Sequence, residues 1–179
     1  LHLEMSKSLR DGKKLGIVGY GNIGAQLSVI AENLGMKVFY YDREEKLALG
    51  NATKCKSLNE LLAVVDVVTL HVDGREANTN LIGDAQFNLM KQGVIFLNLS
   101  RGHVVDIHAL HDNILSGKVA GCAVDVFPHE PIDNNEEFVS ELRGMPNTLL
   151  TPHIGGSTAE AQENIGIFVP GKLMDYINT

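Results

Sequence analysis

Apolar residues gather in six short runs along the chain, and polar or glycine-containing segments separate these runs. Most of the runs are continuous rather than alternating, which is typical of strands in a parallel sheet whose two faces are both covered by helices. The predicted strands span residues 14–19, 37–42, 66–72, 93–100, 119–127 and 147–153.

The segment after the first run has helical periodicity. Residues 22–34 place their apolar side chains on one side of a helix, and Gly35 follows as a residue that commonly ends helices. We expect this apolar face to be the inward one. Its members are Ile23, Leu27, Ile30, Ala31 and Leu34.

Three more helices are indicated by side chains that can accept hydrogen bonds from the free N–H groups of a first helical turn. In the last of these helices, Pro170 lacks the N–H that the carbonyl of Gly166 would accept, so we expect the helix to kink or to end there. The capping candidates are Ser57 with Glu60 before residues 58–65, Asp106 before residues 107–115, and Ser157 with Glu160 before residues 158–169. The alternation of strands and helices predicts an α/β fold with a doubly wound, mostly parallel sheet.

The first predicted strand runs into a glycine-rich turn with the sequence LGIVGYGNIG. Its glycines fit the spacing G-x-G-x-x-G, in which Gly19 permits a tight turn, Gly21 lets the backbone approach a pyrophosphate and Gly24 lets helix and strand pack closely. The pyrophosphate would meet the free N–H groups at the helix N-terminus. We therefore expect a dinucleotide-binding domain of the Rossmann type over residues 1–156, with a short N-terminal lead-in, and a C-terminal helix over residues 157–179.

Asp42 ends the second predicted strand. A carboxylate at this place can accept hydrogen bonds from both ribose hydroxyls of adenosine, and it would repel the 2′-phosphate of NADP. The alternative is an ordinary turn residue at the end of a strand. The order of strand, glycines, helix and second strand favours the cofactor interpretation, with NAD rather than NADP.

Composition and charge restrict the class of partner. The chain of 179 residues is 44% apolar and 21% charged, as in globular proteins, and its net charge of −7 argues against a nucleic-acid partner. It has no apolar run long enough to span a membrane. Cys55 and Cys122 show no motif spacing, and we interpret them as reduced, buried thiols of a cytoplasmic protein.

Three clusters of reactive side chains follow predicted strands, at the sheet edge where such folds bind ligands. Arg101 lies in NLSRGHVVD, Asp125 and Glu130 lie in DVFPHEP, and His153 lies in TPHIGG between a proline and two glycines. Together they are suited to the oxidation of a hydroxy acid. His153 would take the hydroxyl proton, Glu130 would orient the imidazole and Arg101 would hold the substrate carboxylate. Individually, Arg101 could instead form a surface ion pair, Glu130 could be a solvated loop acid and His153 could cap the last helix.

A second cluster of histidines competes with this interpretation, because its spacing resembles that of metal ligands. The inward face of its helix is already taken by leucine and isoleucine, so we interpret the cluster as a solvated helix face and predict no metal. Its members are His103, His108, His111 and Asp112. His71, at the end of a predicted strand, is instead expected to line the cofactor cleft.

In this order, the motifs resemble those of the D-isomer-specific 2-hydroxyacid dehydrogenases. The stretches that carry the likeness are VGYGNIG, NLSRG, DVFPHEP and TPHIGGST, with Asp42 between the first two, and the likeness spans nearly the whole chain. The resemblance implies NAD as cofactor and Arg101, Glu130 and His153 as catalytic residues, with Asp125 beside the nicotinamide. The complete set of cofactor-binding candidates is Gly19, Tyr20, Gly21, Asn22, Ile23, Gly24, Asp42, His71, Ser100, Asp125, His153, Gly155 and Gly156.

The resemblance also implies a reaction and a partner. The reaction would be hydride transfer from 3-phosphoglycerate, giving 3-phosphohydroxypyruvate in the first step of serine biosynthesis, or from a related small 2-hydroxy acid. The subunits would pair as a homodimer through helices of the cofactor domain. The alternatives are another enzyme of the family, such as a hydroxypyruvate reductase, or an NAD-sensing interaction module with the same fold.

The chain departs from the family pattern in three respects. Asp73 stands where a proline is usual, which would alter the loop near the adenine, and Pro170 interrupts the last helix. The resemblance also implies a substrate domain and, in many members of the family, a regulatory domain that binds serine. We expect neither domain within these residues. We therefore expect residues 157–179 to lead back toward a missing substrate domain, and the chain alone to bind NAD without turning over substrate.

Overall fold

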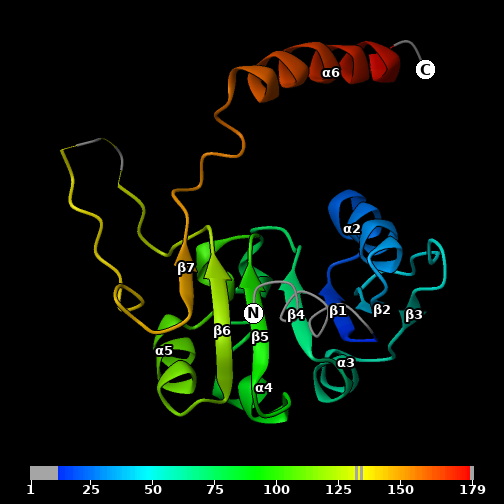
Figure 1. Ribbon diagram of the computed structural model, residues 1–179. Coiled ribbons are helices and arrows are strands. Elements are labelled where there is room, and N and C mark those ends of the chain that lie inside the picture. Colours follow the sequence, from blue (N-terminus) through cyan, green and yellow to red (C-terminus); the bar gives the residue numbers. More distant parts are fainter. Residues whose placement is uncertain (1–11, 132, 134, 178–179) are drawn as a thin grey trace.

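The computed structural model describes residues 12–131, 133 and 135–177, and the expected N-terminal lead-in therefore lies mostly outside the described residues. Seven parallel strands form one sheet in the order β3-β2-β1-β4-β5-β6-β7 (Figure 1). This order confirms the predicted doubly wound α/β fold. The strands are β1 (Lys14–Val18), β2 (Lys37–Tyr41), β3 (Thr53–Lys54), β4 (Val67–Leu70), β5 (Val94–Asn98), β6 (Val119–Val124) and β7 (Thr148–Leu150).

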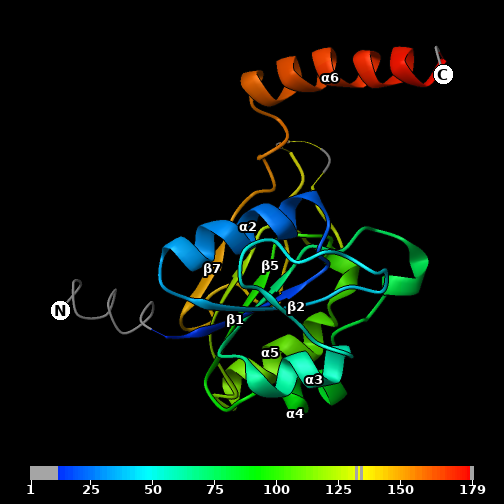
Figure 2. The same cartoon turned by 90° about the vertical axis from the view of Figure 1, so that its right-hand side faces the viewer.

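Helices cover both faces of the sheet. Figure 2 shows α2 on one face and α3, α4 and α5 on the other. The helices are α2 (Asn22–Asn33), α3 (Leu58–Val64), α4 (Asp84–Leu89), α5 (Ile107–Leu115) and α6 (Ala159–Ile177), with short 3₁₀ turns η1 (Glu76–Asn78) and η2 (Gly102–Val104).

The six predicted strands are all present and each is shorter than its apolar run, most clearly β7, which keeps only Thr148–Leu150 of the predicted residues 147–153. Strand β3 was not predicted, because it consists of two exposed residues that give no apolar signal. Two apolar clusters fill the space between the sheet and its helices. The larger includes Phe87, Phe96 and Leu110 beneath α3–α5, and the smaller includes Ile17 and Tyr40 beneath α2.

The predicted inward face of α2 is confirmed at Ala31, which is buried, and at Leu27, which packs against the smaller cluster, but it is wrong at the other three positions. Ile23, Ile30 and Leu34 are 68%, 57% and 50% exposed, whereas the buried residues of the helix are Gly24, Ser28 and Ala31. The close approach of the helix to the sheet explains this choice. A Cβ added at Gly24 would lie 2.2 Å from the carbonyl oxygen of Gly19, so only small residues fit the contact.

The predicted helix ends are largely confirmed. The Ser57 hydroxyl accepts a hydrogen bond from the N–H of Glu60, and the Asp106 carboxylate accepts hydrogen bonds from the first turn of α5. Gly35 has the left-handed φ of +87° expected of a residue that ends a helix. At α6 the cap is Thr158 rather than Ser157, because the Thr158 hydroxyl accepts the N–H of Ala161.

Helix α6 lies apart from the sheet in both views, and none of its residues is buried (Figures 1 and 2). Of the two outcomes expected at Pro170, a kink or an end, the end is wrong, because the helix continues through this residue to Ile177. The carbonyl of Gly166, which loses its N–H partner, belongs to an exposed residue and can bond to water instead. Among the described residues, no helix has the length and apolar character needed to cross a bilayer.

Candidate active site and cofactor cleft

The candidate site residues lie at one edge of the sheet. All strand pairs are parallel, so every strand ends at the same edge. The residues that follow these ends are Gly19 after β1, Asp42 after β2, His71 after β4, Arg101 after β5, Asp125 after β6 and His153 after β7.

The three glycines of the turn differ in backbone conformation and in the space around them. Gly19 has a φ of +92°, and a Cβ there would lie 2.5 Å from the carbonyl oxygen of His71. Gly24 has no room for a side chain either. By contrast, a Cβ at Gly21 would meet nothing within 4 Å. The turn therefore keeps open space at the position where a pyrophosphate would approach the backbone.

The N-terminus of α2 fits the same anion. Its N-cap is Gly21, no side chain caps the helix, and its first turn contains no acidic residue. The N–H groups of this turn are free to donate to a phosphate, and the helix dipole favours negative charge there. These observations on the turn and the helix fit a dinucleotide.

A cleft of about 550 Å³ opens beside this turn. Asp42 lies in its wall, and each of its carboxylate oxygens is already oriented by a backbone group. The N–H of Tyr20 donates to Oδ2 over 2.7 Å, and the N–H of Glu44 donates to Oδ1 over 2.9 Å. Because an oxygen of a carboxylate can accept more than one hydrogen bond, Asp42 can still receive ribose hydroxyls. The cleft is lined by Val18, Gly19, Gly21, Tyr41, Asp42, Arg43, Glu44, Lys46, Leu58, His71, Val72, Asp73, Arg75, Ala77, Asn78 and Leu81.

The other candidates of the turn are placed differently. The Tyr20 side chain is buried, stacks on Tyr40 at 3.8 Å between ring centroids, and hydrogen-bonds to Ser28. Tyr20 can therefore face a cofactor only through its backbone. Asn22 and Ile23 are exposed at the start of α2. The contact of each with a cofactor stays a prediction.

His71 lines the cleft, as predicted. Burial lowers the pKa of its imidazole, so the ring is neutral at neutral pH. Its Nε2 lies 3.0 Å from the Thr69 hydroxyl. A neutral ring at this place adds an uncharged wall to the cleft.

His153 and Glu130 form a hydrogen-bonded pair. The His153 Nδ1 lies 2.8 Å from Oε2 of Glu130, and the other carboxylate oxygen accepts the N–H of Phe127 over 2.9 Å. With Nδ1 donating to the carboxylate, Nε2 keeps its lone pair and can accept a proton. This contact matches the pairing of base and orienting acid that the sequence predicts.

Asp125 holds the His153 segment in place. Its Oδ1 accepts hydrogen bonds from the Thr151 hydroxyl and from the N–H of His153. His153 has a left-handed φ of +52°, a conformation that costs free energy for a residue with a side chain. The two hydrogen bonds to Asp125 offset part of this cost and fix the direction of the imidazole. Thr151 opens the TPHIGG stretch, but nothing in the sequence marks its hydroxyl as a partner of Asp125.

Arg101 is presented by a turn that Asn98 organises. The buried Asn98 side chain accepts hydrogen bonds from the N–H and hydroxyl of Ser100 and donates to the Arg101 carbonyl. A Cβ added at Gly102 would lie 2.0 Å from the Phe127 carbonyl carbon, so a glycine is required where this turn meets the segment after β6. The Arg101 side chain is exposed, and its Nη1 donates to the Ser100 carbonyl over 2.6 Å.

Several candidates do not line this cleft. Arg101, Asp125, Glu130 and His153 follow strands at the same sheet edge but are not among the lining residues, and the same holds for Ser100, Gly155 and Gly156. The Ser100 hydroxyl is buried on Asn98. Gly155 and Gly156 are exposed beyond His153, and the Gly156 carbonyl accepts a hydrogen bond from Gln162. Their contact with a cofactor stays a prediction.

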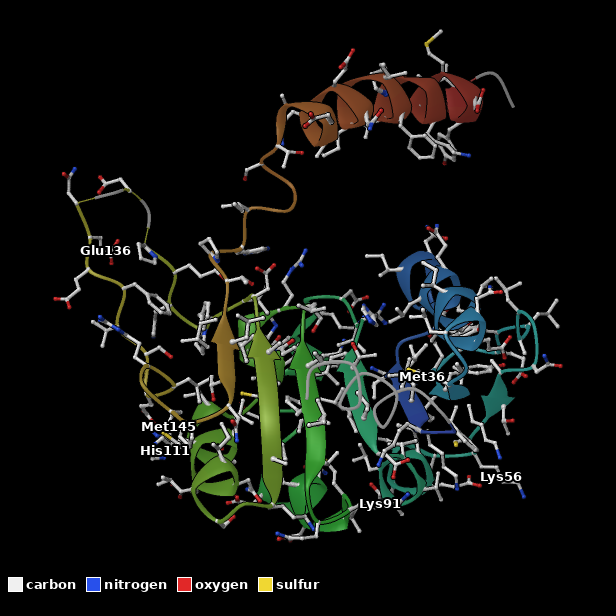
Figure 3. All side chains as sticks on the ribbon, viewed as in Figure 1. Met36, Lys56, Lys91, His111, Glu136 and Met145 are labelled. Atoms are coloured by element: carbon white, nitrogen blue, oxygen red, sulfur yellow. The ribbon has the colours of Figure 1, made fainter. Side chains whose placement is uncertain are left out.

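The histidine cluster is not assembled as one group. His108 pairs with Glu141 at 2.7 Å, and His111 pairs with Asp112 at 3.0 Å. Figure 3 shows His111 on α5, away from the strand ends that carry the candidate site. Within the described residues, no three histidine, cysteine or acidic side chains lie together as a metal site would need.

Comparison with known proteins agrees with this geometry. Residues 2–155 match the family described as D-isomer specific 2-hydroxyacid dehydrogenase, NAD binding domain. D-3-phosphoglycerate dehydrogenase of Haemophilus influenzae is 58% identical over 165 residues, which make up 92% of this chain and 40% of that protein.

Solved structures give the same result. A glyoxylate reductase from Paecilomyes thermophila superposes with a TM-score of 0.81 at 34% identity, over 94% of this chain and 50% of that one. D-lactate dehydrogenase with NAD+ from Lactobacillus jensenii superposes with a TM-score of 0.77 at 28% identity, over 86% of this chain and 49% of that one. The chain thus spans about 40% of the length of its curated relative and about half of these solved chains.

Proposed function

Because this chain belongs to the D-isomer specific 2-hydroxyacid dehydrogenases, as their NAD-binding domain, we propose that it is the cofactor-binding and catalytic part of a D-3-phosphoglycerate dehydrogenase. The reaction would be the NAD-dependent oxidation of 3-phosphoglycerate to 3-phosphohydroxypyruvate, which begins serine biosynthesis. The observation that carries this proposal is the His153–Glu130 pair, at the same sheet edge as the glycine turn, in a chain 58% identical to an enzyme of that name.

The residues of the chain divide the chemistry between them. Nε2 of His153 accepts the proton of the substrate hydroxyl, while Glu130 receives the Nδ1 proton in a hydrogen bond and stabilises the imidazolium that forms. Arg101 pairs with the substrate carboxylate through its guanidinium fork. Bound NAD would accept the hydride from the substrate carbon that bears this hydroxyl.

The cofactor would lie along the strand ends. The open backbone at Gly21 and the N-terminus of α2 receive the pyrophosphate, and Asp42 receives the adenosine ribose. Asp125 follows β6 and accepts a hydrogen bond from the N–H of His153, and this link to the base supports its assignment beside the nicotinamide. The division into a dinucleotide-binding domain over residues 1–156 and a C-terminal helix over residues 157–179 is also part of this proposal.

We also propose that the subunit pairs as a homodimer through the cofactor domain and acts in the cytoplasm. The exposed apolar side chains of α2, among them Ile23 and Ile30, supply a surface suited to a subunit contact. The free, buried thiols of Cys55 and Cys122 fit a reducing compartment. Sedimentation of the chain at micromolar concentration tests the pairing, and a monomer at all concentrations would contradict it.

A chimera tests the enzymatic function. Residues 12–177 replace the corresponding segment of the Haemophilus influenzae enzyme, and NADH formation is followed with 3-phosphoglycerate, glycerate and D-lactate as substrates. We expect turnover of 3-phosphoglycerate in preference to the other two, and His153→Ala in the chimera to lower turnover by about 100-fold or more. Preference for an unphosphorylated acid would favour another member of the family. Tight NAD binding with no turnover of any substrate would favour an NAD-sensing module.

A further inference from the structure

The segment after β4, residues 73–78, brings an unusual set of side chains to the cofactor cleft. Asp73, Arg75 and Asn78 line the cleft, and so do Asp42, Arg43 and Glu44, which follow β2. Because β1 lies between β2 and β4 in the sheet, the two segments come from opposite sides of the glycine turn. Asp42 is the residue to which the proposed function assigns the adenosine ribose. The charges of the segment after β4 therefore face the adenosine end of the site.

Asp73 and Arg75 are held together in a fixed arrangement. The Nε of Arg75 lies 2.8 Å from each carboxylate oxygen of Asp73, and its Nη2 also donates to Oδ2. The buried amide of Asn78 donates to Oδ1 of Asp73 over 2.9 Å and to its carbonyl over 3.0 Å. Asn78 thus orients the carboxylate, and the carboxylate occupies the Nε–Nη2 edge of the Arg75 guanidinium.

Charged residues that follow β2 affect the pKa values of the same pair. The hydrogen bond to Asp73 raises the pKa of the Arg75 guanidinium, and the negative charges of Glu44 and Asp42 act in the same direction. The hydrogen bond from Arg75 lowers the pKa of Asp73, and the positive charge of Arg43 adds to this. Arg75 and Asp42 line the same cleft, and their opposite charges attract each other there.

An arginine beside the adenosine ribose is the group that binds the 2′-phosphate in sites that accept NADP. A guanidinium fork matches phosphate as well as it matches carboxylate, so the two compete for the same donors. In this chain the carboxylate is built in. We propose that Asp73 is a positioning residue for cofactor specificity: by holding Arg75, it keeps the guanidinium from binding a 2′-phosphate and so reinforces the rejection of NADP by Asp42. This inference rests on the proposed NAD site.

The test measures NAD+ and NADP+ binding to the full chain by calorimetry, at one fixed ionic strength. Asp42→Asn provides the starting background, because it removes the first repulsive charge and makes NADP+ binding measurable. Asp73→Ala is then added, and Arg75→Ala is added to that double variant. Asp112→Ala in the Asp42→Asn background is the matched control, because it removes an exposed carboxylate on α5 outside the cleft. Thermal melts show that each variant is folded.

We expect Asp73→Ala to raise NADP+ affinity about tenfold, which at 1.4 kcal/mol per decade is the scale of one charge-assisted hydrogen bond. NAD+ affinity should change by less than about twofold, and Arg75→Ala should abolish most of the gain. An unchanged NADP+ affinity, an equal gain for both cofactors, or a gain that survives the loss of Arg75 would each overturn the inference. The failure of the unmodified chain to bind NAD+ would instead refute the proposed cofactor site.

Discussion

The glycine turn allows one substitution that should affect binding alone and another that should affect folding. Gly21 has φ −79°, which any residue adopts, and no atom lies within 4 Å of an added Cβ. Gly24 lies within α2 and does not need a glycine for its backbone conformation either, but a Cβ there would lie 2.2 Å from the carbonyl oxygen of Gly19. The same motif therefore contains a position with open space and a position with none.

Gly21→Ser should leave the free chain as stable as before or slightly more stable, because serine is a better N-cap than glycine by a few tenths of a kcal/mol. It should weaken NAD binding by about tenfold or more. The new side chain would occupy the space where the pyrophosphate approaches the backbone, and its hydroxyl would engage an N–H group that the phosphate needs. The loss of one hydrogen bond to a charged group is worth about 1.5–3 kcal/mol.

Gly24→Ala should lower the free energy of unfolding by about 1–3 kcal/mol, the usual cost of forcing an extra methyl group into a packed contact. The neighbouring atom belongs to the backbone of the turn, so it cannot move aside as a side chain would. Thermal melts and NAD calorimetry on both variants check the two expectations. A Gly24→Ala chain that melts like the wild type, or a Gly21→Ser chain that loses stability yet keeps its NAD affinity, would refute the reasoning.

Three further outcomes follow from the hydrogen bonds and charges of the fold. In the chimeric enzyme, Glu130→Gln should lower kcat by about 100-fold while KM changes little, because the amide N–H₂ would face Nδ1 of His153 and favour the tautomer that carries its proton on Nε2; unchanged kcat in steady-state assays would contradict this. Burial alone would raise the pKa of Asp66, but hydrogen bonds from Lys91 and from the N–H of Lys14 outweigh it and lower the pKa, so Asp66→Asn should destabilise the chain by about 1 kcal/mol at pH 7. That difference should disappear as the pH falls from the unfolded pKa near 3.9 through the lower folded pKa, as urea unfolding across pH would show. Burial lowers the pKa of His71, so protonation favours the unfolded chain; the stability that this histidine contributes is complete above about pH 6.5 and declines below it, and the decline should be smaller in His71→Gln.

The Asp66 prediction concerns the fold and not the proposed site. Lys91, its partner at 2.8 Å, lies at the end of the sheet opposite to the cleft (Figure 3). Asp66→Asn should therefore leave NAD affinity unchanged where the chain is folded. A loss of NAD affinity in step with the loss of stability would show that the two ends of the sheet are coupled.

Continuous apolar runs were sufficient to predict six of the seven strands, because strands covered by helices on both faces are rich in apolar residues, and only the short, exposed β3 gave no such run. The inward face of α2 could not be predicted in the same way. Periodicity favoured the large side chains, Ile23, Ile30 and Leu34, as the buried ones. The distance between helix and sheet decides otherwise, and that distance is set by the contact of Gly24 with Gly19, which only the folded chain contains.

The candidate site shows the same division between residue type and partner. His153 and Glu130 could be predicted as a pair, because a possible base and a carboxylate on segments that follow two neighbouring strands are an uncommon combination. Asn98 and Thr151 could not be predicted, since short polar residues at strand ends are common in ordinary turns. Only the fold shows that their side chains hold the segments that present Arg101 and His153.

The segment after β4 lines the cleft at Asp73 and Arg75 and also lies against Arg101. Its first residue, Asp73, holds Arg75 at the adenosine end. Its second residue, Gly74, lies beside Arg101 at the substrate end, where an added Cβ would come within 3.3 Å of the arginine Cγ. Asp73, which we propose to act on cofactor choice, and Gly74, which lies against the arginine proposed to bind the substrate, are therefore consecutive residues of one short segment.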